Sequence, residues 1–194
     1  MSRKARSQIL YNGCYAHIIS RSIRKLKVFR NFEDFELFLK VLIDLKSSGS
    51  FKIFHYCLLH THFHLVVEIL SVKEFSKCLN WLKSRYVCAF HTKYRLSGPI
   101  WRERYKSLLI ENDKYLFACG KYVENNPVDA GLVEENKDWK YSSARHYEEG
   151  IADSLIDKYE QPVLIEDLNI KDKNEFEKGD GIVQNFLILT TKRS

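Results

Sequence analysis

Three histidines stand at alternate positions in the apolar stretch LLHTHFHLVVEI, residues 58–69. Because a β-strand sends successive side chains to opposite faces, a strand here would place His60, His62 and His64 on one face. Neutral imidazole is the commonest metal ligand in proteins, so the stretch indicates a metal site. Histidines that only form hydrogen bonds in a strand give the same pattern, and the spacing alone leaves both interpretations open.

A second feature is the segment KYVENNPVDAGLV, in which Tyr122 and Asn126 are four residues apart. Residues at this spacing lie above one another on a helix face. Taken alone, Tyr122 fits a core tyrosine in line with Tyr115 and Cys119, and Asn126 fits a helix C-cap. Pro127 disfavours helical geometry at the residue before it, so we expect the helix to stop there, with the Asn126 side chain free to turn toward an ion.

The composition fits one globular domain with a small addition. Of the 194 residues, 45% are hydrophobic and 29% are charged. We assign residues 1–150 to a domain and residues 151–194 to a C-terminal extension of unknown role. The net charge is +6, and cations stand beside aromatic residues in WRERYKS and WLKSRY. This mixture suits a single-stranded nucleic acid, although aromatic residues in a core with cations at its rim explain it as well.

The five cysteines form no CxxC pair, and the chain starts with the basic, polar stretch MSRKARSQ. No apolar run approaches the roughly 18 residues that span a bilayer. We therefore expect a protein with free thiols in the reducing cytoplasm and no membrane partner.

The elements that must position these residues follow from hydrophobic periodicity. We expect Asn31 with Asp34, and Ser71 with Glu74, to start the two longest helices. The predicted strands cover residues 14–20, 51–59, 62–69 and 103–111, and the predicted helices cover 32–46, 72–95 and 113–126. Their order predicts an α+β, ferredoxin-like (split βαβ) antiparallel sheet with helices on one face, plus an additional C-terminal helix. A late strand at 182–192 is also expected.

Five segments occur in this order along the chain: YAHIISR, LLHTHFHLVVE, IWRERYKSLLIEND, YVENNPVDAGLV and WKYSSARHY. Over residues 8–148 the chain resembles the HUH single-strand DNA transposases with one catalytic tyrosine, of the REP-associated tyrosine transposase type. The resemblance implies that His62, His64 and Asn126 bind a divalent metal, Mg²⁺ or Mn²⁺, and that Tyr122 is the nucleophile. It implies a transposase that cuts and rejoins hairpin-bearing single-stranded DNA through a 5′-phosphotyrosine, as a monomer or a homodimer.

Three positions depart from the family pattern. Thr61 stands where asparagine is common, Asp129 where a basic residue is common, and His60 where proline is common. His60 is an additional candidate for the site, and a third imidazole would favour Zn²⁺ more than two do. The cations expected to contact DNA are Arg21, Arg102, Arg104, Lys106 and Lys121.

Two other functions compete with this interpretation. A non-catalytic nucleic-acid binding module on a ferredoxin-like sheet predicts that chelators leave binding unchanged and that the change Tyr122→Phe has no effect. A metallohydrolase with His60, His62 and His64 around zinc predicts tightly held zinc and no covalent protein–DNA adduct.

Overall fold

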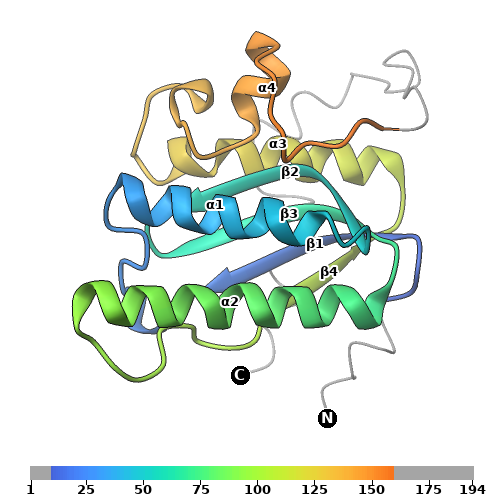
Figure 1. Ribbon diagram of the computed structural model, residues 1–194. Helices are drawn as coiled ribbons and strands as arrows, with labels where there is room; N and C mark the ends of the chain where they lie inside the picture. Colours follow the sequence, from blue (N-terminus) through green and yellow to red (C-terminus); the bar gives the residue numbers. More distant parts are fainter. Residues whose placement is uncertain (1–9, 160–194) are drawn as a thin grey trace, which may run out of the picture.

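The computed structural model describes residues 10–159, apart from the side chain of residue 114. The elements are β1 (Cys14–Arg21), α1 (Phe32–Lys46), β2 (Phe51–Leu59), β3 (His62–Ile69), α2 (Val72–Tyr94), β4 (Lys106–Ile110), α3 (Asp113–Asp129) and α4 (Ala144–Glu149), with 3-10 turns η2 (Ile23–Lys25) and η3 (Asn136–Asp138). Figure 1 shows the predicted order of strands and helices. The late strand predicted at 182–192 lies outside the described residues.

The four strands form one antiparallel sheet in the order β2-β3-β1-β4 (Figure 1). This order and the helix connections confirm the predicted α+β, ferredoxin-like fold. The turn His60–Thr61 joins β2 to β3, and Leu59 pairs with His62 across it. The predicted hairpin is therefore present with the predicted strand ends.

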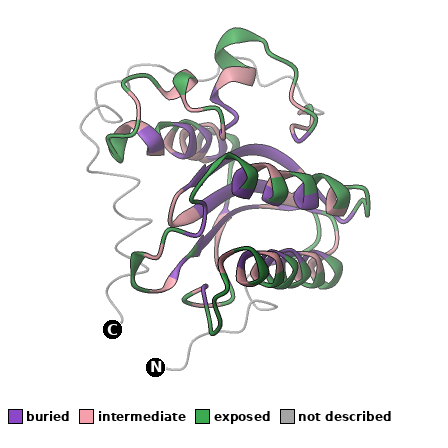
Figure 2. Cartoon of the chain, turned by 60° about the vertical axis from the view of Figure 1, so that its left-hand side comes forward, coloured by how far each residue is buried: buried purple, intermediate pink, exposed green. Residues whose placement is uncertain are grey.

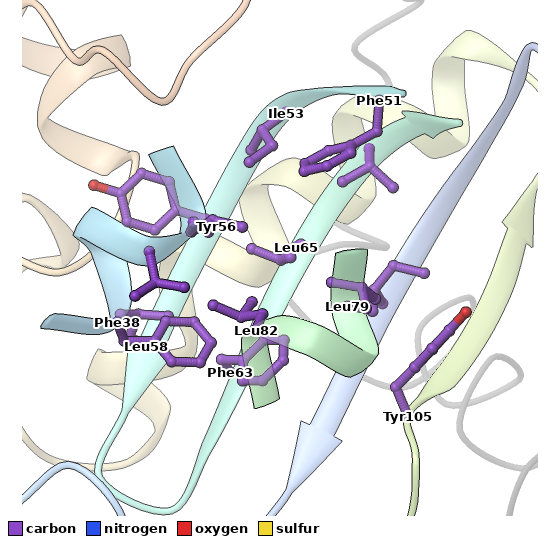
Figure 3. Packing of buried hydrophobic residues seen from close by; sticks show 14 of the residues in the cluster. Phe38, Phe51, Ile53, Tyr56, Leu58, Phe63, Leu65, Leu79, Leu82 and Tyr105 are labelled. Atoms are coloured by element: carbon purple, nitrogen blue, oxygen red, sulfur yellow. The ribbon is translucent and has the colours of Figure 1, made fainter. Parts of the chain in front are cut away.

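The two faces of the sheet carry two separate hydrophobic clusters. Figures 1 and 2 show α1 and α2 on one side of the sheet and α3 on the other. Alternate residues of β3 divide between the faces, since Phe63 and Leu65 pack with α1 and α2 while Val66 packs with α3. Figure 3 shows the larger cluster, in which Phe38 of α1 and Leu82 of α2 meet the strands. The helix expected to carry the nucleophile thus covers the face that the ferredoxin-like unit leaves open.

The two long helices start at the predicted caps. The Asn31 side chain accepts a hydrogen bond from the Asp34 backbone N–H, and the Asp34 carboxylate accepts one from the Asn31 N–H. The Ser71 hydroxyl likewise accepts from the Glu74 N–H. Both predicted helix starts are confirmed.

The prediction that Pro127 ends the third helix is wrong, because α3 continues through this residue to Asp129. A proline inside a helix removes one backbone donor, which leaves the carbonyl four residues earlier without its usual partner. That carbonyl belongs to Val123, and the Asn126 side-chain amide lies 3.4 Å from it and 2.7 Å from the Tyr122 carbonyl. The amide replaces part of the missing hydrogen bonding, so the helix persists.

The strand predicted at 103–111 is also shorter than expected, since β4 begins at Lys106. The carbonyls of Glu103 and Arg104 accept hydrogen bonds from the Lys83 ammonium group of α2 instead of joining the sheet. Tyr105 is completely buried between this point and the strand.

Residues 151–159 pack against the sheet beyond the predicted domain boundary at residue 150. The Asp157 N–H donates to the Ile53 carbonyl, and the Ile53 N–H donates to the Asp157 carboxylate, both at 2.8 Å. The Tyr56 hydroxyl donates to Asp153, and Leu155 is buried in the main core. The globular unit therefore extends to at least Tyr159, the last described residue.

All five cysteines are free thiols. Between residues 10 and 159, none of the helices combines the length and the apolar character that crossing a bilayer requires.

Gly120 sets the distance between α3 and β2. A Cβ atom at this position would lie 2.4–2.7 Å from the ring of His55 on β2. Gly→Ala in a helix interior normally stabilises by roughly 0.5–1 kcal/mol, but overpacking a close contact costs roughly 1–3 kcal/mol. We expect Gly120→Ala to lower the free energy of unfolding in urea, and an unchanged or higher value would contradict this close approach.

Candidate functional site

The pairing of β1 with β3 brings a third histidine to the predicted histidine pair. Ile19 stands opposite His64 and Arg21 stands opposite His62. Directly opposed residues of an antiparallel pair project to the same face, and so does His17, two residues before Ile19. One face of the sheet, the face covered by α3, therefore carries three imidazoles and a guanidinium group.

His17 and His64 are in direct contact. The Nε2 atom of His17 and the Nδ1 atom of His64 are 2.8 Å apart and share a hydrogen bond. Their ring centroids are 5.1 Å apart, and the interplanar angle of 25° shows that the two rings are nearly parallel. Both side chains are buried, and the other nitrogen of His64, Nε2, has no hydrogen-bond partner within the described part of the chain.

The second histidine of the pair, His62, is held in a similar way. Its Nδ1 atom lies 2.9 Å from the hydroxyl oxygen of Thr61, and its ring centroid lies 5.0 Å from that of His64. The Thr61 departure from the family pattern therefore supplies a polar contact to the pair.

All three imidazoles are neutral at physiological pH. Burial, followed by the charge of Arg21, lowers the pKa of His17 to about 3 and that of His62 to about 4. Burial also lowers the pKa of His64 well below its ordinary value, with His17, His62 and Arg21 adding to the effect. A neutral imidazole keeps the lone pair that a metal ion needs.

Helix α3 places Tyr122 against this cluster. Its ring centroid lies 6.1 Å from that of His17 and 6.1 Å from that of His64, with the rings nearly perpendicular in both pairs. Burial raises the pKa of Tyr122, the charge of Arg21 lowers it, and Asp129 and Cys119 raise it further. The phenol is therefore protonated at neutral pH, and the nearby guanidinium group favours its ionised form. The tyrosine and the histidines belong to the same chain.

Asn126 lies one helical turn after Tyr122 in α3. Because a carbonyl oxygen can only accept, the amide nitrogen of Asn126 must face the carbonyls of Tyr122 and Val123. This orientation keeps the Oδ1 atom out of both of these hydrogen bonds. An amide oxygen and two imidazole nitrogens form a ligand set that a divalent cation accepts.

The donors present fit such an ion only in part. The orphaned Nε2 atom of His64 is buried and has the free lone pair of a ligand, which favours a cation at this point. Between residues 10 and 159, however, no cluster of three or more His, Cys, Asp or Glu side chains could hold a metal ion. The protein donors in this region are therefore few, and an ion held by them would need further oxygen ligands from another molecule.

The prediction that His60 shares the face of His62 and His64 is wrong. His60 lies in the turn between β2 and β3, outside the alternation of either strand. Its Nδ1–H group donates to the Phe29 carbonyl at 2.6 Å, and its ring packs against Phe35 and Trp139. The structure thus gives His60 a packing role away from the pair, and a site built from the three histidines of the LLHTHFH stretch is not formed.

Of the five cations predicted to contact DNA, four lie on β1, on β4 or on the segment before β4, and one lies beside α4. Arg21 is exposed and close enough to affect all four ring side chains of the site through its charge. The exposed Arg102 donates its backbone N–H to the Arg21 carbonyl, and Lys106 stands opposite Ile19, so it projects to the same face. Arg104 is exposed on the segment before β4. Lys121 instead lies beside α4, with its ammonium group 4.0 Å from Glu148.

A buried polar network under α3 was not predicted from the sequence. Glu124 has an exposed fraction of 0%, although it lies in the polar segment KYVENN. Its Oε1 atom is 2.8 Å from His55 Nδ1 and accepts a hydrogen bond from the Ser143 hydroxyl at 2.8 Å. The other nitrogen of His55 shares a hydrogen bond with the Tyr159 hydroxyl. The network ties α3 to β2 and to the segment after α3, and thereby fixes where Tyr122 lies.

A ferredoxin-like sheet with a histidine pair facing a tyrosine on a covering helix is the arrangement expected of a tyrosine transposase. Residues 10–126 match the family model described as "Transposase IS200 like". The chain therefore belongs to the IS200-like transposase family. The matched range includes every predicted metal ligand and the predicted nucleophile.

Individual relatives agree with the family. A Haemophilus influenzae protein named as a REP-associated tyrosine transposase is 34% identical over 98 residues, which cover 45% of this chain and 55% of the relative. The match thus spans about half the length of that relative. The solved structure of a REP-associated tyrosine transposase bound to a REP hairpin matches with a TM-score of 0.62 and 21% identity, covering 82% of this chain and 93% of that chain. This second likeness supports the fold.

Proposed function

We propose that the protein is a metal-dependent single-strand DNA endonuclease and strand transferase that acts through a 5′-phosphotyrosine on Tyr122. The observation that carries the proposal is the contact of the Tyr122 ring with the two imidazoles His17 and His64, beside the unpartnered Nε2 atom of His64. A core tyrosine does not need such a surrounding, whereas a nucleophile that attacks a phosphate next to a cation does.

Each residue of the site has a separate role in the proposed reaction. His62, His64 and Asn126 would hold a divalent cation, Mg²⁺ or Mn²⁺, and the ion would neutralise the charge of the scissile phosphate as a Lewis acid. Tyr122 loses its proton and its phenolate oxygen bonds to phosphorus, while the bond from phosphorus to the 3′-oxygen breaks. The departing 3′-oxygen takes up a proton and becomes a free hydroxyl group. Rejoining reverses these steps, so no nucleoside triphosphate is consumed.

The DNA partner is proposed to be a single strand that carries a hairpin. This proposal is supported by the relative that was solved with a REP hairpin and by the exposed cations Arg21, Arg102 and Arg104. Exposed cations of this kind bind the phosphates of a DNA backbone without recognising its base sequence. The free thiols support a reducing, cytoplasmic location.

The direct test is covalent capture of labelled DNA. Hairpin-bearing single-stranded oligonucleotides labelled at the 3′ end are incubated with the protein and Mg²⁺ or Mn²⁺, and the products are separated on a denaturing gel. We expect the label to migrate with the protein, and peptide mass spectrometry to find it on Tyr122. A 5′-end label should instead appear on a shorter free strand, because the fragment with the 3′-hydroxyl is released.

The same experiment separates the proposal from its competitors. EDTA should abolish the adduct. Metal-independent binding without any adduct, over a broad oligonucleotide pool, would favour the binding module, and cleavage without an adduct would favour a hydrolase.

The pH dependence of adduct formation tests the role of Arg21. Its positive charge lowers the pKa of Tyr122, so Arg21→Gln raises this pKa and less phenolate is present at a given pH. We expect the rise of the reaction rate with pH to move to higher pH in this variant. Arg102→Gln is the matched control, because it removes an exposed cation that does not affect the Tyr122 pKa. It should weaken DNA binding and leave the pH profile in place, and equal profiles for all three proteins would contradict the assignment.

A further inference from the structure

We propose that His17 is a positioning residue: it accepts a hydrogen bond from the Nδ1–H group of His64 and so holds His64 in the tautomer whose Nε2 atom can bind a divalent cation. The proposal deepens the proposed function and rests on it for the identity of the ligand. It concerns a residue on a different strand, 47 positions away from His64 in the sequence.

The contact geometry requires one proton between the two rings. The His17 Nε2 and His64 Nδ1 atoms are 2.8 Å apart, a distance that needs one donor and one acceptor. Two neutral imidazoles can share this proton in two ways. If His17 donates, His64 carries its own proton on Nε2; if His64 donates, its Nε2 atom has a free lone pair.

Only the second arrangement lets His64 act as a metal ligand. The Nε2 atom of His64 is buried and has no hydrogen-bond partner among residues 10–159. In the first arrangement this would be a buried N–H group without an acceptor, which costs roughly 1–3 kcal/mol. In the second it is a buried lone pair that a cation can use. Histidines that bind metals commonly donate their other ring N–H to a fixed acceptor, and here that acceptor is His17 Nε2.

The neighbouring histidine has a contact of the same kind. The Thr61 hydroxyl oxygen lies 2.9 Å from His62 Nδ1 and can accept its proton, which leaves the Nε2 atom of His62 free as well. Each of the two histidines thus has a possible acceptor at its Nδ1 atom, which leaves Nε2 as the candidate ligand atom in both. This repetition supports an orienting role for His17 rather than an accidental contact.

The two acceptors differ in burial, so we expect their substitution to weaken metal binding to different extents. Thr61 is partly exposed, so water can replace its hydroxyl group in a Thr61→Val variant. His17 has an exposed fraction of 3%. Removing its ring leaves His64 Nδ1 without a replacement, so the larger loss is expected for His17.

The test measures Mn²⁺ binding by electron paramagnetic resonance or calorimetry in the absence of DNA. We expect His17→Leu to weaken Mn²⁺ binding roughly 10- to 100-fold. His17→Gln should recover most of the affinity, because a glutamine amide oxygen can take the place of His17 Nε2 as acceptor. Thr61→Val should lose less affinity than His17→Leu.

A second measurement uses the wild-type protein and does not depend on how a variant folds. Long-range ¹H–¹⁵N spectra of the histidine rings report which nitrogen carries the proton. We expect His64 to be protonated at Nδ1 with Mg²⁺ bound. A proton on Nε2 of His17, or direct binding of the ion by His17, would overturn the proposal, and so would a His17→Leu variant that binds Mn²⁺ as tightly as the wild type.

His64→Ala separates this outcome from failure of the proposed function. If His64→Ala loses Mn²⁺ binding while His17→Leu does not, the metal site is present and His17 does not position it. If neither change affects Mn²⁺ binding, the ion site itself is wrongly placed and both proposals fail.

Discussion

Tyr122→Phe is expected to abolish covalent capture of DNA while leaving hairpin binding within about twofold of the wild type. The change removes one oxygen atom, which is the atom proposed to attack phosphorus, and keeps the ring that packs beside His17 and His64. Because Tyr122 is the proposed nucleophile, we expect the loss to be complete rather than partial. Gel capture of a 3′-labelled oligonucleotide measures the first quantity and a gel-shift titration in EDTA measures the second.

Tyr115→Phe is the matched control for this prediction. Tyr115 lies two turns earlier on α3 and is also partly buried, in the cluster that packs α3 onto the sheet. Its change should leave the adduct in place. An adduct that survives in Tyr122→Phe would show that another nucleophile does the chemistry.

Glu124→Ala is expected to lower the free energy of unfolding by about 3 kcal/mol or more. The substitution leaves His55 Nδ1 and the Ser143 hydroxyl in the interior without their shared acceptor. A buried donor left without its acceptor costs roughly 1–3 kcal/mol, and two donors lose theirs here. Because the pair joins α3 to β2, the variant should also form adduct more slowly at temperatures where it remains folded. Urea unfolding gives the first value and single-turnover kinetics give the second.

Two further variants show whether the carboxylate itself is needed. Glu124→Gln keeps an oxygen that can accept from His55 and Ser143, and should cost less than Glu124→Ala. The exposed Glu134→Ala, on the segment after α3, should change the stability by less than about 0.5 kcal/mol. A Glu124→Ala variant as stable as Glu134→Ala would show that the network does not hold the helix.

Local sequence patterns were sufficient for the fold because most of its elements have local causes. Asn31 and Ser71 start helices through hydrogen bonds to residues three positions later. The hairpin needs only two apolar strands around a two-residue turn. The same turn explains the error at His60, because turn residues leave the alternation of the strand. The alternation of a strand was applied to His60 although it lies in the turn, so the predicted face contained one histidine too many.

The site residues that were not predicted from the sequence, His17 and Glu124, depend on contacts between residues far apart in the chain. His17 reaches His64 only because β1 pairs with β3 in a register that sets Ile19 opposite His64. A single histidine inside the apolar strand YAHIIS was the available signal, and it gains meaning only beside a second strand with histidines. Glu124 gave no signal, since a glutamate within KYVENN is typical of an exposed helix face. Its burial follows from the close packing that Gly120 permits.

The position of Tyr122 against the histidines of its own chain has a topological consequence. In the proposed reaction the cut strand stays covalently attached to the molecule whose histidines hold the cation, so cutting and rejoining take place at the same site. The loose 3′ end is then the only reactant that can be exchanged. In this arrangement, the 3′ end that reaches the phosphotyrosine determines whether the original strand is resealed or a new strand is joined.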